Sequence, residues 1–206
     1  MNSPTQFRVF SDSFVIYVPL KSDDEPLGPA IGIFSALISA CFVMIAALRG
    51  THPIRGGIDV GLGMEIAPGE IYGPALERAH FLESFVAEHR RILIGDGLWQ
   101  YLSLGESVPV TCPASNAVRE LTRMAKELVS DDVDGHRILD YLGPKFLKES
   151  GADFGPDMVK PAYEFVVQQD ELWRSRQDAK LSARYHNVRQ YFESRLQLWG
   201  LVGDNS

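Results

Sequence analysis

The stretch that decides the fold spans residues 55–94 and reads RGGIDVGLGMEIAPGEIYGPALERAHFLESFVAEHRRILI. Its opening, residues 55–62, alternates between apolar and other positions, which predicts a β-strand that its glycines leave unusually bare. The Gly-Pro pair at 73–74 then signals the start of a helix. A second, shorter strand is predicted at residues 91–94. Between these signals, apolar residues recur at helical spacing: Leu76, Ala79, Leu82 and Val86.

Two further elements are predicted on the N-terminal side of this stretch. Residues 6–10 and 14–18 carry the alternation and the β-branched and aromatic content of strands, and residues 11–13 between them suit a tight turn. We therefore expect a β-hairpin with Asp12 at its tip. A long apolar helix follows, beginning near Pro29. The order hairpin, helix, strand, helix, strand predicts an α+β sandwich with helices on one face of the sheet.

The C-terminal half has a different character. Residues 116–129 are amphipathic, and residues 161–199 combine many Arg, Gln and Glu residues with spaced apolar ones. Both patterns favour helices. We therefore expect two parts, a core at residues 1–113 and a helical extension at residues 114–206.

Composition limits the classes of partner. The chain has 206 residues with 45% hydrophobic and 23% charged content, which is typical of a globular protein rather than a disordered one. Its net charge of −7 argues against nucleic acid as a partner. The two cysteines form neither a disulfide framework nor a zinc-binding spacing. Without a signal-peptide pattern at the N-terminus, a cytoplasmic protein is the simplest expectation.

One segment allows a different interpretation. No charged residue lies between Leu27 and Leu48, acidic residues precede this run, and basic residues follow it. Such a run is long enough to cross a bilayer, so a membrane-associated helical protein is an alternative. The favoured interpretation is a helix buried against a sheet or at a dimer interface.

Four pieces of sequence occur in a characteristic order: Phe10–Phe14, Arg55–Gly61, Gly69–Leu76 and Ala87–Ile92. Together, over roughly residues 6–95, the chain resembles the class III nucleotidyl cyclases. The resemblance is greatest to divergent bacterial relatives that include the Pycsar-type pyrimidine cyclases of antiphage defence. It implies a ferredoxin-like cyclase core, with an antiparallel-rich sheet and helices on one face, and it implies a homodimer.

The resemblance also implies a metal site. In the family, two aspartates hold two divalent ions, Mg or Mn, which bind a nucleoside triphosphate and help the ribose 3′-hydroxyl to attack the α-phosphorus. Asp12 matches the hairpin aspartate; its alternative role is to close the turn through its side chain. The other aspartate lies on a strand that opens the family domain. This chain begins at Met1 almost directly before the hairpin, so we expect an N-terminally truncated core that lacks that strand.

Two further positions match the residues with which the family recognises its base. They hold Arg8 and Glu70, where the adenine-reading pair is lysine with aspartate. Arg8 and Glu70 keep the charges of that pair but not its geometry, so they do not identify the base. The alternative is an exposed strand arginine and a loop carboxylate, paired across the sheet.

The family's helix supplies an asparagine and, four residues later, an arginine that stabilises charge in the transition state. Glu77 and Phe81 occupy these two positions. Because phenylalanine cannot donate a hydrogen bond, this substitution removes transition-state stabilisation. The alternative interpretation makes Phe81 a core residue and Glu77 a surface residue.

Three hypotheses for the function follow. The first is a cyclase-like protein with impaired catalysis, acting as a nucleotide-binding or dimerising module. The second is an active cyclase that makes a 3′,5′-cyclic monophosphate, in antiphage signalling or elsewhere. The third is the membrane-associated helical protein.

Overall fold

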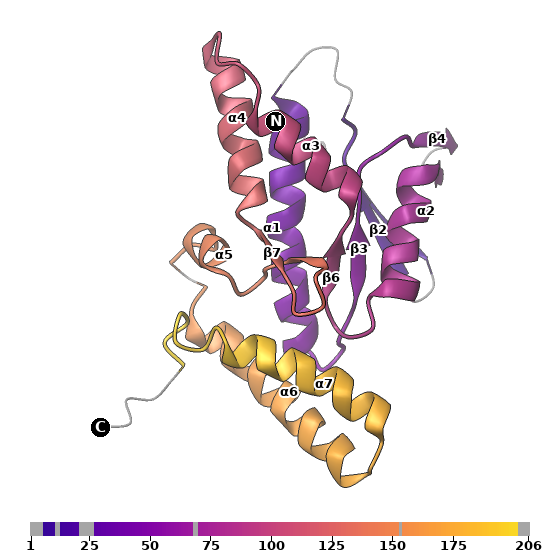
Figure 1. Cartoon of the computed structure of the whole chain (residues 1–206), viewed down its shortest axis with the longest axis vertical. Helices are drawn as coiled ribbons and strands as arrows, with labels where there is room; N and C mark the ends of the chain where they lie inside the picture. The colour runs from indigo at the N-terminus through magenta and orange to yellow at the C-terminus, as the bar shows by residue number, and fades with distance from the viewer. Residues whose placement is uncertain (1–5, 11–12, 21–26, 68–69, 153, 202–206) are drawn as a thin grey trace.

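The computed structural model describes residues 6–10, 13–20, 27–67, 70–152 and 154–201, and the side chains from residue 13 onward within these ranges. The described chain is an α+β protein in which helix exceeds strand (Figure 1). The α+β class predicted from the sequence is therefore confirmed. The prediction of helices on one face of the sheet is wrong: Ile92 and Ile94 pack into the main core with the long helix at residues 28–49, whereas Leu93 packs on the opposite face with Leu82 and Val86.

A four-stranded mixed sheet lies at the centre of the fold. Its strand order is β3 (Gly56–Ile58), β6 (Ile92–Ile94), β8 (Arg137–Leu139) and β7 (Val129–Asp131). Strands β3 and β6 are parallel, and the other two pairings are antiparallel. The predicted strands at 55–62 and 91–94 are confirmed in place, but β3 is shorter because the chain turns at Asp59 to meet two helices.

Strands β7 and β8 were not predicted. Their sequences, VSD and RIL, are short and mix polar with apolar residues, whereas β6 was indicated by the continuous apolar run ILI. Residues 114–206 are therefore not wholly helical, and the sheet takes strands from both sides of residue 113. Whether residues 1–113 and 114–206 fold independently is not tested by the structure, so the boundary at 113 stays a prediction.

Two antiparallel hairpins accompany this sheet. The first pairs β1 (Gln6–Phe10) with β2 (Ser13–Tyr17), as predicted, and its tip with Asp12 lies outside the described residues. The second pairs β4 (Met64–Ala67) with β5 (Glu70–Tyr72) and projects from the body of the molecule (Figure 1). The sequence did not predict this second hairpin.

Helix α1 (Gly28–Arg49) is the predicted long apolar helix, and Pro29 occupies its first turn. It runs through the middle of the fold and packs against α4 (Pro113–Lys126) and α6 (Pro156–Ser175) (Figure 1). By length and composition α1 could also cross a membrane. Its most buried side chains belong to the main hydrophobic core: Leu37, Cys41, Met44, Ile45 and Leu48.

The remaining helices frame this core. Helix α2 (Pro74–Phe81) continues into a π-helical turn, η1 (Leu82–Val86), and the two lie over β3. Helix α3 (Asp96–Glu106) pairs with α4, and the short α5 (Pro144–Glu149) contacts α1.

The predicted single helix at 161–199 is wrong, because the chain reverses after α6 and returns as α7 (Ala179–Glu193). Gln177 adopts φ of 57° at the reversal, and the Asp178 carboxylate caps α7 by accepting from the backbone N–H of Leu181 at 2.9 Å. Between the two helices, Asp170 is fully buried and accepts hydrogen bonds from Arg174 and Arg189. A sequence rich in helix formers conceals such a break.

Residues at the end of α7 and just after it form hydrogen bonds with the residues that follow β8. The Asp140 carboxylate accepts hydrogen bonds from the Tyr191 hydroxyl at 2.7 Å and from the Arg195 guanidinium at 3.0 and 3.1 Å. The Trp199 indole N–H donates to the carbonyl oxygen of Leu142 at 2.9 Å. These bonds hold the segment after α7 against the core.

Candidate functional site

The residues matched to base recognition lie in two different sheets. Arg8 is on β1, opposite Val15, and its side chain lies outside the described part of the chain. Glu70 is exposed at the start of β5. Because β1 and β5 belong to separate two-stranded sheets, Arg8 and Glu70 do not face each other across one sheet.

The two altered helix positions both face solvent on α2. Glu77 is exposed, as its alternative interpretation predicted. Phe81 is 55% exposed, so the prediction of a core phenylalanine is wrong. Its ring stacks on Phe85, with centroids 5.5 Å apart and planes at 28°.

The reason for this exposure is the close approach of α2 to β3. A methyl group added at Gly57 would lie 2.3 Å from the carbonyl oxygen of Ala79 and 2.7 Å from Cβ of Leu82. That contact turns Ala79 and Leu82 toward the sheet. Phe81 and its stacking partner Phe85 are therefore turned outward.

Exposed apolar side chains gather in this region. Of the twelve exposed large hydrophobic residues in the described part, six fall within residues 62–85, on α2, η1 and the neighbouring β4–β5 hairpin. We call them the α2–hairpin surface: Leu62, Met64, Ile66, Tyr72, Phe81 and Phe85. So many exposed large hydrophobic residues in one stretch of sequence make it a candidate interaction site.

A buried carboxylate that sequence reasoning missed joins β3, α2 and α3. The Asp59 side chain is 3% exposed. Its Oδ1 accepts from the backbone N–H groups of Val60 at 2.8 Å and Leu98 at 2.9 Å. Its Oδ2 accepts from Nε of Arg78 at 2.6 Å, and Nη2 of Arg78 donates to the Val60 carbonyl at 2.8 Å.

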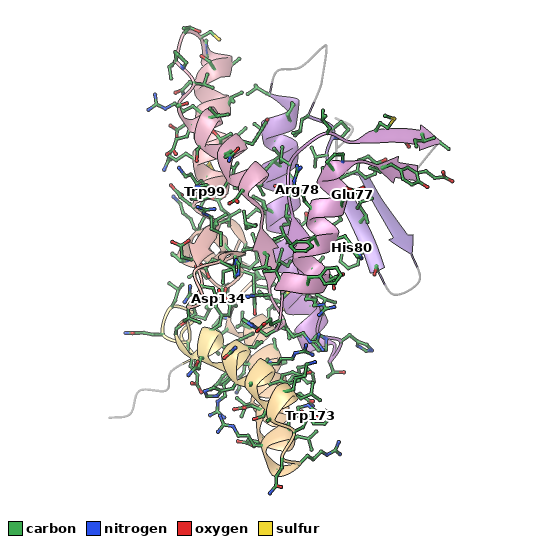
Figure 2. All side chains as sticks on the ribbon, turned by 45° about the vertical axis from the view of Figure 1, so that its right-hand side comes forward. Glu77, Arg78, His80, Trp99, Asp134 and Trp173 are labelled. Atoms are coloured by element: carbon green, nitrogen blue, oxygen red, sulfur yellow. The ribbon has the colours of Figure 1, made fainter. Side chains whose placement is uncertain are left out.

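The contacts of Asp59 and Arg78 stabilise the fold and leave little room for binding a ligand. Both oxygens of Asp59 already accept hydrogen bonds, so the carboxylate has little capacity left for a metal or a substrate. Arg78, labelled on α2 in Figure 2, is next to the position of the family's asparagine, but its guanidinium is engaged with β3. Glycines make room for the ion pair: a Cβ at Gly95 would lie 2.4 Å from Cγ of Asp59, and one at Gly61 would lie 2.1 Å from Nη2 of Arg78.

A second charged cluster lies at the start of β6. Arg91 is 3% exposed, and its Nη1 and Nη2 donate to Asp132 at 2.5 Å and to Asp134 at 2.6 Å. Burial opposes its charge, but the hydrogen bonds to Asp134 and Asp132 outweigh burial and raise the pKa of Arg91. The buried His89 ring lies 3.5 Å from the Asp132 carboxylate. Burial, reinforced by the charge of Arg91, lowers the pKa of His89 and favours its neutral form.

Neither cluster has the composition of a metal centre. Within the described ranges, no group of three or more His, Cys, Asp or Glu residues could hold a metal ion. Asp12, the residue matched to a metal ligand, lies outside those ranges. The Mg or Mn site therefore stays a prediction.

Comparison with known proteins adds no family assignment. Protein-family models, curated proteins and solved structures were each compared with this chain, and none matches it.

Proposed function

We propose that this protein is a class III nucleotidyl cyclase-like module, with a ferredoxin-like cyclase core, that serves in association rather than in efficient catalysis. The four sequence pieces on which the resemblance rests fall at the β1–β2 hairpin, at β3, from β5 into α2, and just before β6. Within this proposal, Asp12 remains the candidate ligand for Mg or Mn, and Arg8 and Glu70 remain the candidate contacts to the base.

The observation that carries the proposal is the position of Phe81. It occupies the place of the family's transition-state arginine, and it stacks on Phe85 at the surface. Losing such a donor typically raises the reaction barrier by about 3 kcal/mol, roughly a hundredfold or more in rate. The neighbouring Arg78 does not supply the donor, because Asp59 and the Val60 carbonyl hold its guanidinium.

The partner that we propose is a second copy of this chain. On the α2–hairpin surface, Phe85 is 72% exposed and Met64 is 66% exposed. Exposing apolar side chains to water is unfavourable, and a dimer contact would bury them. The chain's net charge of −7 argues against a nucleic acid as the partner, and an apolar contact between two copies needs no opposite charge. The homodimer implied by the resemblance would bury this surface.

The first test measures oligomeric state by light scattering after size exclusion. The wild type should be a dimer, and Phe81→Ser with Phe85→Ser should be a monomer with an unchanged circular dichroism spectrum. Val133→Ser is the matched control, because Val133 is 93% exposed on the β7–β8 turn and should leave the dimer intact. A monomeric wild type, or a dimeric double variant, would contradict the proposed interface.

The second test addresses catalysis. The protein is incubated with each of the four ribonucleoside triphosphates and Mn, and cyclic monophosphates are measured by mass spectrometry. We expect no product above background. A product that disappears in Asp12→Ala would establish the active-cyclase alternative, and with it the impaired module would be abandoned.

We further propose a cytoplasmic location. Support comes from α1, whose apolar residues Leu37, Met44 and Leu48 pack within the main core. Purification in the soluble fraction without detergent would agree with this proposal. Recovery only from membranes would instead support the membrane-associated alternative, for which the length and composition of α1 speak.

A further inference from the structure

A small, partly open cavity lies where α7 meets the sheet. Its volume is about 10 Å³, and residues from four segments line it: His89, Arg91, Asp132, Tyr141, Val188 and Tyr191. Two of them, Val188 and Tyr191, belong to α7, and the ring of Tyr141 packs on that of Tyr191 with centroids 4.8 Å apart. The cavity is therefore part of the joint between the C-terminal helices and the core.

Two polar atoms on the residues that line this cavity have no hydrogen-bond partner within the protein. They are Nε of Arg91 and the hydroxyl of Tyr141, on side chains that are 3% and 2% exposed. Across the described residues, Ser130 Oγ is the third such buried atom, so two of the three are carried by residues that line this one cavity. Buried polar groups without a partner are unfavourable, and native proteins satisfy nearly all of them.

The size and chemistry of the cavity select one occupant. A volume of about 10 Å³ corresponds to one water molecule. A polyatomic anion exceeds this volume, and the charge of Arg91 is already matched by Asp132 and Asp134. The same guanidinium repels a metal cation.

We propose that this cavity is a binding site for a single structural water, which accepts a hydrogen bond from Nε–H of Arg91 and shares another with the Tyr141 hydroxyl. The water ties the start of β6 to the segment after β8 beneath α7. This inference is independent of the proposed cyclase-like function, since it rests only on the cavity and its two polar atoms.

The test combines a crystal structure with a matched pair of variants. We expect an ordered water within hydrogen-bond distance of both atoms in the wild type and its loss in Tyr141→Phe. That variant should lower Tm by about 2–4 °C, the shift for one lost hydrogen bond in a chain of this size. Tyr163→Phe is the control, because its hydroxyl makes only a weak contact of 3.4 Å to Glu193 at the surface, and its Tm should not change.

Two results would overturn the proposal. One is a dry cavity in the wild-type crystal structure. The other is a Tyr141→Phe protein whose Tm equals or exceeds that of the wild type, because a hydroxyl without any partner destabilises the fold and its removal is neutral or favourable.

Discussion

Replacing Asp59 by asparagine should destabilise the fold without changing its shape. Asparagine has the same size, and its carbonyl oxygen can still accept from the backbone N–H groups of Val60 and Leu98. Its amide nitrogen, however, would face Nε of Arg78, which now donates to the carboxylate at 2.6 Å. Two donors would then oppose each other in a nearly closed space.

The magnitude follows from what is lost and what is recovered. A hydrogen bond to a charged group contributes about 1.5–3 kcal/mol. The Arg78 side chain is 48% exposed, so its guanidinium can regain water, and this favours the lower part of the range. We expect Asp59→Asn to lower the free energy of unfolding by about 2 kcal/mol, equivalent to a fall in Tm of roughly 4–8 °C.

Chemical denaturation followed by circular dichroism measures this difference. Asp96→Asn is the control, because Asp96 is on the first turn of the same helix α3 and pairs with Arg137 at 3.0 Å while its side chain is 87% exposed. It should lose less than about 1 kcal/mol. The reasoning is refuted if Asp59→Asn loses no more than Asp96→Asn.

Three further predictions concern packing, thiol reactivity and pH. Gly57→Ala should destabilise the protein by about 1–3 kcal/mol in the same denaturation assay, because its methyl group would meet the backbone of α2 at 2.3 Å. Gly63→Ala, whose nearest neighbour would lie at 3.8 Å, should be nearly neutral, and equal losses would contradict the contact. A thiol reagent should modify one cysteine rapidly in the native protein and two after denaturation. The exposed Cys112 receives a hydrogen bond from the backbone N–H of Ser115 that lowers its pKa, whereas burial raises the pKa of Cys41. Two fast thiols in the native state would count against the burial of Cys41. The Arg91 guanidinium lowers the pKa of Asp134 from 3.8 to about 2. Its stabilising contribution is therefore complete above about pH 4 and is lost as pH falls toward 2. Asp134→Asn should be less stable than the wild type at neutral pH, and this difference in stability should shrink as the pH falls toward 2. A difference that stays constant would contradict a lower pKa of Asp134 in the folded than in the unfolded chain.

The elements that could be predicted are those with a signal in their own short stretch of sequence. The alternation at 6–10, the uncharged run of α1 and the Gly-Pro start of α2 each have a local physical cause, and the structure has an element at each place. Strands β7 and β8 were not predicted, because their sequences VSD and RIL lack the continuous apolar run ILI that indicated β6, and because β8 pairs with a strand distant in the chain. The reversal at Gln177 was missed because good helix formers surround its one local signal, the capping residue Asp178.

The charged contacts were beyond sequence reasoning for a related cause. Asp59 and Arg78 are 19 residues apart, and Arg91 and Asp134 are 43 apart, so only the packed fold reveals that they pair. The glycines at 57, 61 and 95 were a usable signal, since bare backbone often marks a close approach. The exposure of Phe81 was predicted wrongly because its apolar side chain suggested a core position, although Phe81 lies outside the helical stripe of Leu76, Ala79, Leu82 and Val86.

The fastening of Trp199 and Arg195 to residues 140–142 has a consequence for the order of synthesis. The Trp199 indole N–H donates to a carbonyl 57 positions earlier in the chain. While the intervening residues are synthesised, β8 and the core residues beneath α7 therefore remain exposed. At roughly 5–20 residues per second the wait lasts several seconds. During translation, a chain made only as far as α6 therefore exposes apolar surface that α7 and the turns up to Trp199 will cover.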